Sequence, residues 1–262
     1  MTNLPEVLAG LKVLAKEVGT FIQTESQSFD KKNIQFKGLN DLVSYVDKTA
    51  ESMLVEGLKK LLPEAGFITE EGTATHGDET YKWIVDPLDG TTNFVHGLPI
   101  YGISVGLIHE NDLVLGLVHE LNRDECFYAL ADGPAYCNDQ VIKVSGTDKL
   151  SESLLATGFP YHNFQSIKKY LEILDSFMQG THGLRRLGSA AVDLVYVACG
   201  RFEGFFEYNL NPWDVAAGAL IVQRAGGIVT DFKGKGDFVF GREIVAGNRV
   251  QPEILKIIQH HW

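Results

Sequence analysis

Apolar residues recur at helical spacing in two stretches near the start of the chain. Between positions 4 and 24 they lie three and four residues apart, which predicts an amphipathic helix. A second helix is predicted within residues 37–66, with Pro63 and Gly66 marking its end. Asp47 falls near the first turn of this second helix.

Shorter apolar runs follow and predict strands. The runs "FITEE" (67–71) and "WIVDP" (83–87) are bounded by polar residues. Residues 101–120 predict two strands joined by a tight turn at Glu110, Asn111 and Asp112. The first 150 residues are therefore expected to place two helices on a largely antiparallel sheet.

The second half alternates between predicted strands and predicted helices. This pattern is typical of a sheet with helices on both faces. No linker-like composition separates the two halves. We expect one domain, residues 1–262, in which 1–150 form an N-terminal α+β layer and 151–262 a C-terminal α/β layer.

Composition and charge narrow the function classes. Hydrophobic residues make up 45% and charged residues 22% of the chain, which is ordinary for a folded globular protein. A formal net charge of −11 argues against nucleic acid or an anionic membrane as partner. If the substrate is an anion, a metal ion is the simplest way to hold it.

The chain start and the cysteines indicate a compartment. The first residues lack the pattern of a signal peptide, and no apolar run reaches the roughly 20 residues of a membrane span. The three cysteines, Cys126, Cys137 and Cys199, show no C-x-x-C spacing. We expect free thiols in a cytoplasmic protein.

The stretch "WIVDPLDGTTNF" carries the first candidate chemistry. Two acids, Asp86 and Asp89, follow an apolar run, and Pro87 keeps Asp86 extended before the chain turns. Both carboxylates can then point to one place, together with the carbonyl of Leu88. Such hard oxygen ligands suit Mg²⁺ better than Zn²⁺. The alternative is that both acids serve only as turn and helix-cap residues.

Neighbouring residues add to this pattern. Gly90, Thr91 and Thr92 predict the start of a helical turn, whose backbone N–H groups can bind phosphate. Glu70 stands at another strand end, and Asp214 at the first turn of a later helix, where the helix dipole alone would favour an acid. The histidines form no H-E-x-x-H motif, which argues against zinc.

Two long motifs, "WIVDPLDGTTNF" and "WDVAAGALIVQRAGG", resemble the signatures of the inositol monophosphatase family of metal-dependent, lithium-sensitive phosphatases. The resemblance extends over nearly the whole chain and includes "DLVSYVD", "TEEG", "LGSAAVDL" and "FFEYNLNPWD". It implies a layered αβαβα sandwich of the inositol monophosphatase and fructose-1,6-bisphosphatase type. It also implies two or three Mg²⁺ ions per site and a homodimer.

The resemblance assigns roles residue by residue. Glu70, Asp86 and the Leu88 carbonyl would hold one Mg²⁺, and Asp86, Asp89 and Asp214 a second. Thr91, positioned by Asp47, would activate the attacking water, with Glu70 also near it. The N–H groups of Gly90 and Thr91 would bind phosphate. The residues in contact with the alcohol part of the substrate would be Gly188, Ser189, Ala190 and Glu207, and Asp214 would also contact the substrate. Lys37 matches a lysine in a loop that is one residue shorter than the family pattern, so no role is assigned to it.

Several functions fit these residues. The resemblance favours hydrolysis of inositol monophosphate, or a similar polyol phosphate, by metal-activated water. The same chemistry on fructose 1,6-bisphosphate, 3′-phosphoadenosine 5′-phosphate or NADP would need further cations, which Arg185 and Arg186 could supply. A non-catalytic protein with a structural Ca²⁺ site is the alternative from a different class.

Overall fold

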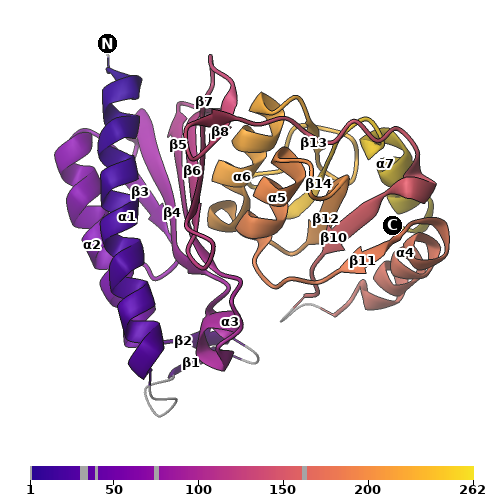
Figure 1. Ribbon diagram of the computed structural model, residues 1–262, viewed down its shortest axis with the longest axis horizontal. Helices are drawn as coiled ribbons and strands as arrows, with labels where there is room; N and C mark the ends of the chain where they lie inside the picture. Colours follow the sequence, from indigo (N-terminus) through magenta and orange to yellow (C-terminus); the bar gives the residue numbers. More distant parts are fainter. Residues whose placement is uncertain (1, 30–34, 39–40, 74–76, 161–163) are drawn as a thin grey trace.

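The computed structural model describes residues 2–29, 35–38, 41–73, 77–160 and 164–262 (Figure 1). Its helices, in chain order, are α1 Leu4–Ser28, α2 Tyr45–Leu61, α3 Thr91–His96, α4 Ile167–Gly180, α5 Ala190–Ala198, α6 Pro212–Arg224 and α7 Gln251–His261. A 3₁₀ turn covers Leu150–Glu152. Within the described ranges, no helix is both long enough and apolar enough to cross a membrane.

A seven-stranded sheet forms the first half of the chain. Its order is β3-β4-β5-β6-β7-β8-β9, and all neighbours are antiparallel except β3 and β4, which run parallel. The strands are β3 Gly66–Thr69, β4 Tyr81–Asp89, β5 Gly102–His109, β6 Asp112–Glu120, β7 Glu125–Leu130, β8 Ala135–Cys137 and β9 Gln140–Val141. The expected antiparallel sheet is confirmed, and so is the tight turn between β5 and β6, where Glu110 has a positive φ of 58°.

A five-stranded mixed sheet forms the second half, in the order β11-β10-β12-β14-β13. β10 runs parallel to β11 and β12, whereas β14 is antiparallel to both of its neighbours. The strands are β10 Leu154–Thr157, β11 Gly183–Arg185, β12 Gly204–Tyr208, β13 Ile228–Thr230 and β14 Glu243–Gly247. A separate pair, β1 Gln35–Gly38 and β2 Asp41–Val43, precedes α2.

Five layers of helix and sheet stack along the long axis of the molecule (Figure 1). The pair α1 and α2 covers one face of the seven-stranded sheet, and its apolar face packs there in one buried cluster. The pair α5 and α6 lies between the two sheets in a second cluster. The pair α4 and α7 covers the outer face of the five-stranded sheet. The αβαβα sandwich is therefore confirmed, with helices on both faces of the second sheet.

Close packing of α6 on the seven-stranded sheet brings distant parts of the chain together. A Cβ atom at Gly116 in β6 would lie 2.7 Å from the Ala217 carbonyl oxygen, a distance that no side chain tolerates. Glycine at this position lets the helix approach the sheet backbone directly. The approach sets the first turn of α6 near the end of β4.

Helix α1 is longer than the apolar pattern predicts. It continues from position 24 to Ser28, through a polar segment that the pattern leaves outside the helix. Residues 25–28 are mostly exposed, so they contribute no apolar periodicity. Glu25 and Gln27 are good helix formers, and this local preference is consistent with the extra turn.

Candidate functional site

The end of β4 departs from regular pairing where the two acids lie. Trp83, Ile84 and Val85 are fully buried. The register against β5 then shifts between Asp86 and Asp89, so that the intervening residues bulge. A carboxylate oxygen of Asp86 accepts a hydrogen bond from the Leu88 N–H at 2.9 Å. This local turn aims both acids to one side of the strand.

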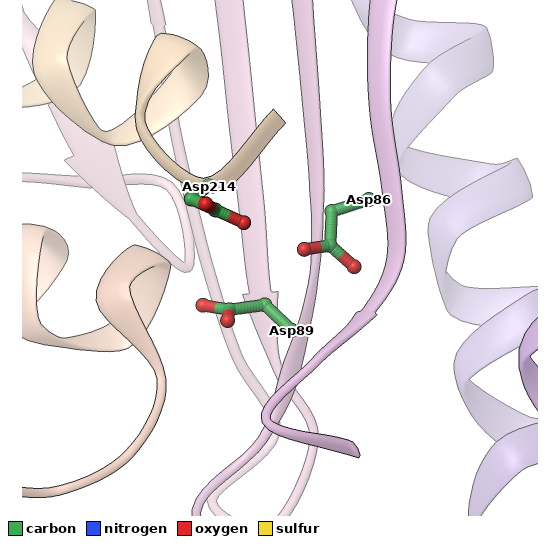
Figure 2. A group of neighbouring side chains, drawn as sticks. All are labelled: Asp86, Asp89 and Asp214. Carbon is green, nitrogen blue, oxygen red and sulfur yellow. The ribbon is translucent and has the colours of Figure 1, made fainter. Parts of the chain in front are cut away.

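Three carboxylates converge beside this turn. Oxygens of Asp86, Asp89 and Asp214 all lie within 4.8 Å of one another. Figure 2 shows the three side chains pointing toward a common point from β4 and from the start of α6. Asp86 is buried, and the other two are half-buried.

Burial raises the pKa values of all three acids, and repulsion by neighbouring acids adds to this for Asp86 and Asp214. Burial raises the pKa of Asp89 to about 6, although hydrogen bonds from Ser189 and Ala191 and the nearby Arg186 charge act in the opposite direction. Burial first, and the neighbouring acids second, raise the pKa values of Asp86 and Asp214 well above their usual range. A cation bound among the three acids would reverse this penalty.

Helix α5 holds Asp89 in place. One carboxylate oxygen of Asp89 accepts from the Ser189 hydroxyl and from the Ala191 N–H, both at 2.6 Å. Ser189 is also the N-cap of α5, where its oxygen accepts from the Val192 N–H at 3.3 Å. The start of α5 thus orients an acid of the group, in addition to lining the cavity.

Asp214 is fixed by its own helix. It is the third residue of α6, and its carboxylate accepts from the Asn211 N–H at 2.7 Å. This reciprocal contact at a helix start is one half of a capping box. Capping and membership of the acid group therefore coexist in one side chain.

Asp47 is buried at the start of α2 and contacts the chain near the acids. One of its oxygens accepts from the Ser44 N–H at 2.9 Å, and the other accepts from the Thr91 hydroxyl at 2.9 Å. The Thr91 hydroxyl also lies 3.0 Å from the Leu88 carbonyl oxygen. Asp47 therefore fixes the orientation of Thr91, as the proposed pairing of these two residues requires.

Gly90 allows the chain to turn from β4 into α3. It has φ of 97° and is the N-cap of that helix. A Cβ atom at this position would lie 3.0 Å from the Ile100 carbonyl oxygen, in a backbone conformation that other residues rarely adopt. Thr91 consequently starts α3 directly beside the acids.

One cavity joins nearly all of the predicted residues. Among the described residues, Asp47 is the only assigned residue that does not line the cavity. It contacts the cavity indirectly, through its hydrogen bond with Thr91. The assigned residues that line the cavity are Glu70, Asp86, Leu88, Asp89, Gly90, Thr91, Gly188, Ser189, Ala190, Glu207 and Asp214. Glu70 lies outside the tight three-acid group, but its charge contributes to the raised pKa of Asp86.

Glu207 lies inside strand β12. Strand β12 continues through Tyr208, and Glu207 pairs with Ile244 of β14. The side chain is buried, and burial raises its pKa to about 8, with Arg186 opposing the shift. The sheet therefore holds this carboxylate rigidly at the cavity.

Of the two arginines considered as phosphate partners, only Arg186 lines the cavity among the described residues. Its charge acts on Asp89, Asp193 and Glu207. Arg185 is exposed in β11. Lys37 belongs to β1, but its side chain lies outside the described part of the structure.

Sequence reasoning missed Asp193, a further acid that lines the cavity. Asp193 is buried in α5, one turn after Ser189, and its Oδ1 has no hydrogen-bond partner among the described residues. The sequence did contain a signal for this residue. Asp193 is the one acid in the apolar run "AAVDLVYVA", and it follows the helix cap Ser189 by four positions, which places both on one side of the helix.

Comparisons with known proteins point to one family. The family model described as the inositol monophosphatase family matches residues 3–262. The inositol-1-monophosphatase of Mesorhizobium japonicum is 38% identical over 247 residues, covering 94% of this chain and 93% of that protein. The Nus factor SuhB of Escherichia coli K12 is 39% identical over 243 residues, covering 92% of this chain and 90% of that protein.

Solved structures give the same result. The extragenic suppressor protein SuhB from Bartonella henselae superposes with a TM-score of 0.91 at 37% identity, covering 97% of this chain and 98% of that one. The family model, the relatives and the solved structure each cover nearly the whole chain. The chain belongs to the inositol monophosphatase family.

Proposed function

We propose that the protein hydrolyses a small phosphate monoester in the presence of Mg²⁺, with inositol monophosphate as its favoured substrate. The convergence of Asp86, Asp89 and Asp214 within 4.8 Å carries this proposal. Residues 1–262 would act as a single phosphatase domain, cytoplasmic and homodimeric as in the family resemblance.

The donor set fits Mg²⁺. All candidate ligands are oxygens, and the acids are packed closely enough to repel one another without a cation. Glu70, Asp86 and the Leu88 carbonyl would hold one ion, and Asp86, Asp89 and Asp214 a second. Bound Mg²⁺ would lower the pKa of water and neutralise charge on the phosphate and the leaving alkoxide.

The chain's own residues supply orientation and proton handling. Asp47 accepts from the Thr91 hydroxyl at 2.9 Å, so the Thr91 oxygen is held with its lone pairs available to a water molecule. The backbone N–H groups of Gly90 and Thr91 at the start of α3 would bind phosphate oxygens. The alcohol part of the substrate would lie against Gly188, Ser189 and Ala190.

The buried carboxylate of Glu207 favours a polyol over a substrate with a second phosphate. A carboxylate accepts hydrogen bonds from ring hydroxyls but repels a further phosphate. Arg186 and Arg242 are the two arginines that line the cavity among the described residues. The charge of Arg186 already faces Asp89, Asp193 and Glu207, and the Arg242 guanidinium donates to Asn209 and Asn211. This excess of acids counts against fructose 1,6-bisphosphate, 3′-phosphoadenosine 5′-phosphate and NADP.

Phosphate release from a substrate panel tests the proposal. Inositol 1-phosphate should be hydrolysed with Mg²⁺ and not with EDTA, and faster than the three bisphosphorylated or nucleotide compounds. The Escherichia coli relative is named as a Nus factor, so a non-catalytic role is kept as the second candidate. Absence of Mg²⁺-dependent phosphate release from every monoester in the panel would favour that candidate.

A further inference from the structure

A second buried acid of α2 faces the same side of the helix as Asp47. Glu51 follows Asp47 by four residues, which places both side chains on one face. Glu51 is completely buried, and none of the roles assigned so far uses it. Its partners are found in the segment that follows β3.

Both oxygens of Glu51 accept hydrogen bonds from that segment. One oxygen accepts from the Glu71 N–H at 2.7 Å. The other accepts from the Thr73 N–H at 2.9 Å and from the Thr73 hydroxyl at 2.7 Å. Three uncharged donors thus surround one carboxylate, an arrangement that matches its acceptor-only chemistry.

These contacts fix the position of Glu70 from one side. The Glu71 N–H belongs to the peptide bond that directly follows Glu70, so Glu51 orients the backbone carrying the Glu70 side chain. From the other side, the Glu70 N–H donates to the Val85 carbonyl at 3.3 Å, next to the β3–β4 pairing of Thr69 and Val85. Glu70 is therefore clamped between α2 and β4 at the edge of the cavity.

We propose that Glu51 is a positioning residue that holds Glu70 in place to bind a divalent cation. The inference rests on the proposed function of the site. One face of α2 would then serve the site twice, because Asp47 orients Thr91 and Glu51 orients Glu70 one helical turn later. Outer contacts of this kind typically change metal affinity by 10- to 100-fold when they are lost.

The substitution Glu51→Gln tests this role in the full chain. The amide keeps one acceptor oxygen, but its NH₂ group then faces an N–H donor of the 71–73 segment. We expect the calorimetric dissociation constant for Mg²⁺ and the Mg²⁺ concentration for half-maximal activity both to rise by about 10-fold. kcat at saturating Mg²⁺ should stay within about threefold of wild type, since Glu51 touches no reacting group.

A milder variant gives a graded result. Thr73→Val removes only the hydroxyl donor and leaves both backbone donors to Glu51. It should raise the Mg²⁺ dissociation constant in the same direction, by roughly two- to threefold. This variant also decides the matter if Glu51→Gln does not fold.

Asp231→Asn is the matched control. Asp231 is a buried acid that accepts from the Lys233 and Lys235 N–H groups at 2.9 and 2.7 Å, and it does not line the cavity. Its substitution should lower the melting temperature and leave Mg²⁺ binding unchanged. If Glu51 only stabilised the fold, Glu51→Gln would likewise lower the melting temperature and leave Mg²⁺ binding unchanged.

The outcomes separate the two proposals. If the wild type binds Mg²⁺ but neither Glu51→Gln nor Thr73→Val changes the dissociation constant, the positioning role is wrong and the proposed function stands. If the wild type neither binds Mg²⁺ nor releases phosphate, the proposed function itself fails. Weakened Mg²⁺ binding in both variants, with Asp231→Asn unchanged, supports the positioning role.

Discussion

Helices α2 and α6 begin with the same local motif and end up with different partners. In each, the third residue is an aspartate whose carboxylate accepts from the N-cap N–H: Asp47 from Ser44, and Asp214 from Asn211. The second oxygen of Asp47 accepts a hydrogen bond from the Thr91 hydroxyl. Asp214 instead joins two further acids, and its pKa rises well above the usual range.

The difference shows that a helix cap and a functional group are not competing explanations for one residue. A capping contact uses one carboxylate oxygen and fixes the side chain rotamer. The remaining oxygen is then held in a defined direction at little further entropic cost. What lies in that direction, a hydroxyl for α2 or other acids for α6, decides the role.

Asp214→Asn should reduce turnover more than any substitution in α2. The amide oxygen can still accept from the Asn211 N–H, so the cap should survive while one charge of the acid group is lost. We expect kcat to fall by at least about 10³-fold, since a metal clamp contributes several kcal/mol to transition-state stabilisation. Steady-state phosphate release and the melting temperature measure the two effects separately.

Asp89→Asn is the companion to that experiment. It removes a carboxylate from the same group without touching the α6 cap, and the fold should remain intact. Turnover should fall as far as in Asp214→Asn. Near-normal activity of either variant at saturating Mg²⁺ would contradict the assignment of these acids to a metal site.

Asp47→Asn should have the next largest effect, of a different kind. Loss of the charged acceptor frees the Thr91 hydroxyl, and we expect kcat to fall by about 10²- to 10³-fold, the range for general base catalysis. The Mg²⁺ dissociation constant should hardly change, because Asp47 lies outside the acid group. Steady-state kinetics measure the fall in kcat, and isothermal titration measures the Mg²⁺ dissociation constant of the same variant. If Asp47→Asn weakens Mg²⁺ binding as much as Asp214→Asn does, the two aspartates do not have different roles.

Glu207→Ala should affect substrates unequally. Hydrogen bonds to charged groups contribute about 1.5–3 kcal/mol, so kcat/KM for inositol 1-phosphate should fall by roughly 10- to 150-fold. p-Nitrophenyl phosphate has no ring hydroxyls and should lose far less. Equal losses on both substrates would assign Glu207 to the metal site or to the fold.

The smallest effect concerns pH. The pKa of Asp89 is about 6 in the folded protein, above its ordinary value near 3.9, so the folded state binds more protons than the unfolded state between these values. Metal-free stability should therefore fall as pH rises from about 4 to 6. Because Mg²⁺ binds the ionised acids, its effect on the melting temperature should be larger at pH 7.5 than at pH 5, by on the order of 2–4 °C. Scanning calorimetry checks this, and an equal Mg²⁺ effect at both pH values would contradict it.

Local patterns in the sequence predicted much of this molecule. Apolar spacing gave both N-terminal helices, and the acids in the first turns of α2 and α6 fit the preference of a helix start for negative charge. Glu207 pairs with Ile244 of β14, but the apolar pattern does not show that this strand places the Glu207 carboxylate at the cavity.

Contacts between distant segments could not be predicted from pattern. Asp214 meets Asp86 only because α6 packs closely on the sheet at Gly116, a tertiary fact without a local signal. The family resemblance supplied that pairing instead. Glu51 was missed for a related reason, since its partners Glu71 and Thr73 lie about 20 residues away in a loop.

An anomalous difference map from a crystal soaked in Mn²⁺ tests directly whether Asp86, Asp89 and Asp214 form a metal centre. We predict peaks among the carboxylates of Asp86, Asp89 and Asp214, with ligand distances of roughly 2.0–2.3 Å. At least one peak should also lie near Glu70 and the Leu88 carbonyl. A map without a peak among these acids, or with Mn²⁺ bound only elsewhere, would contradict the claim that this acid group is a metal centre.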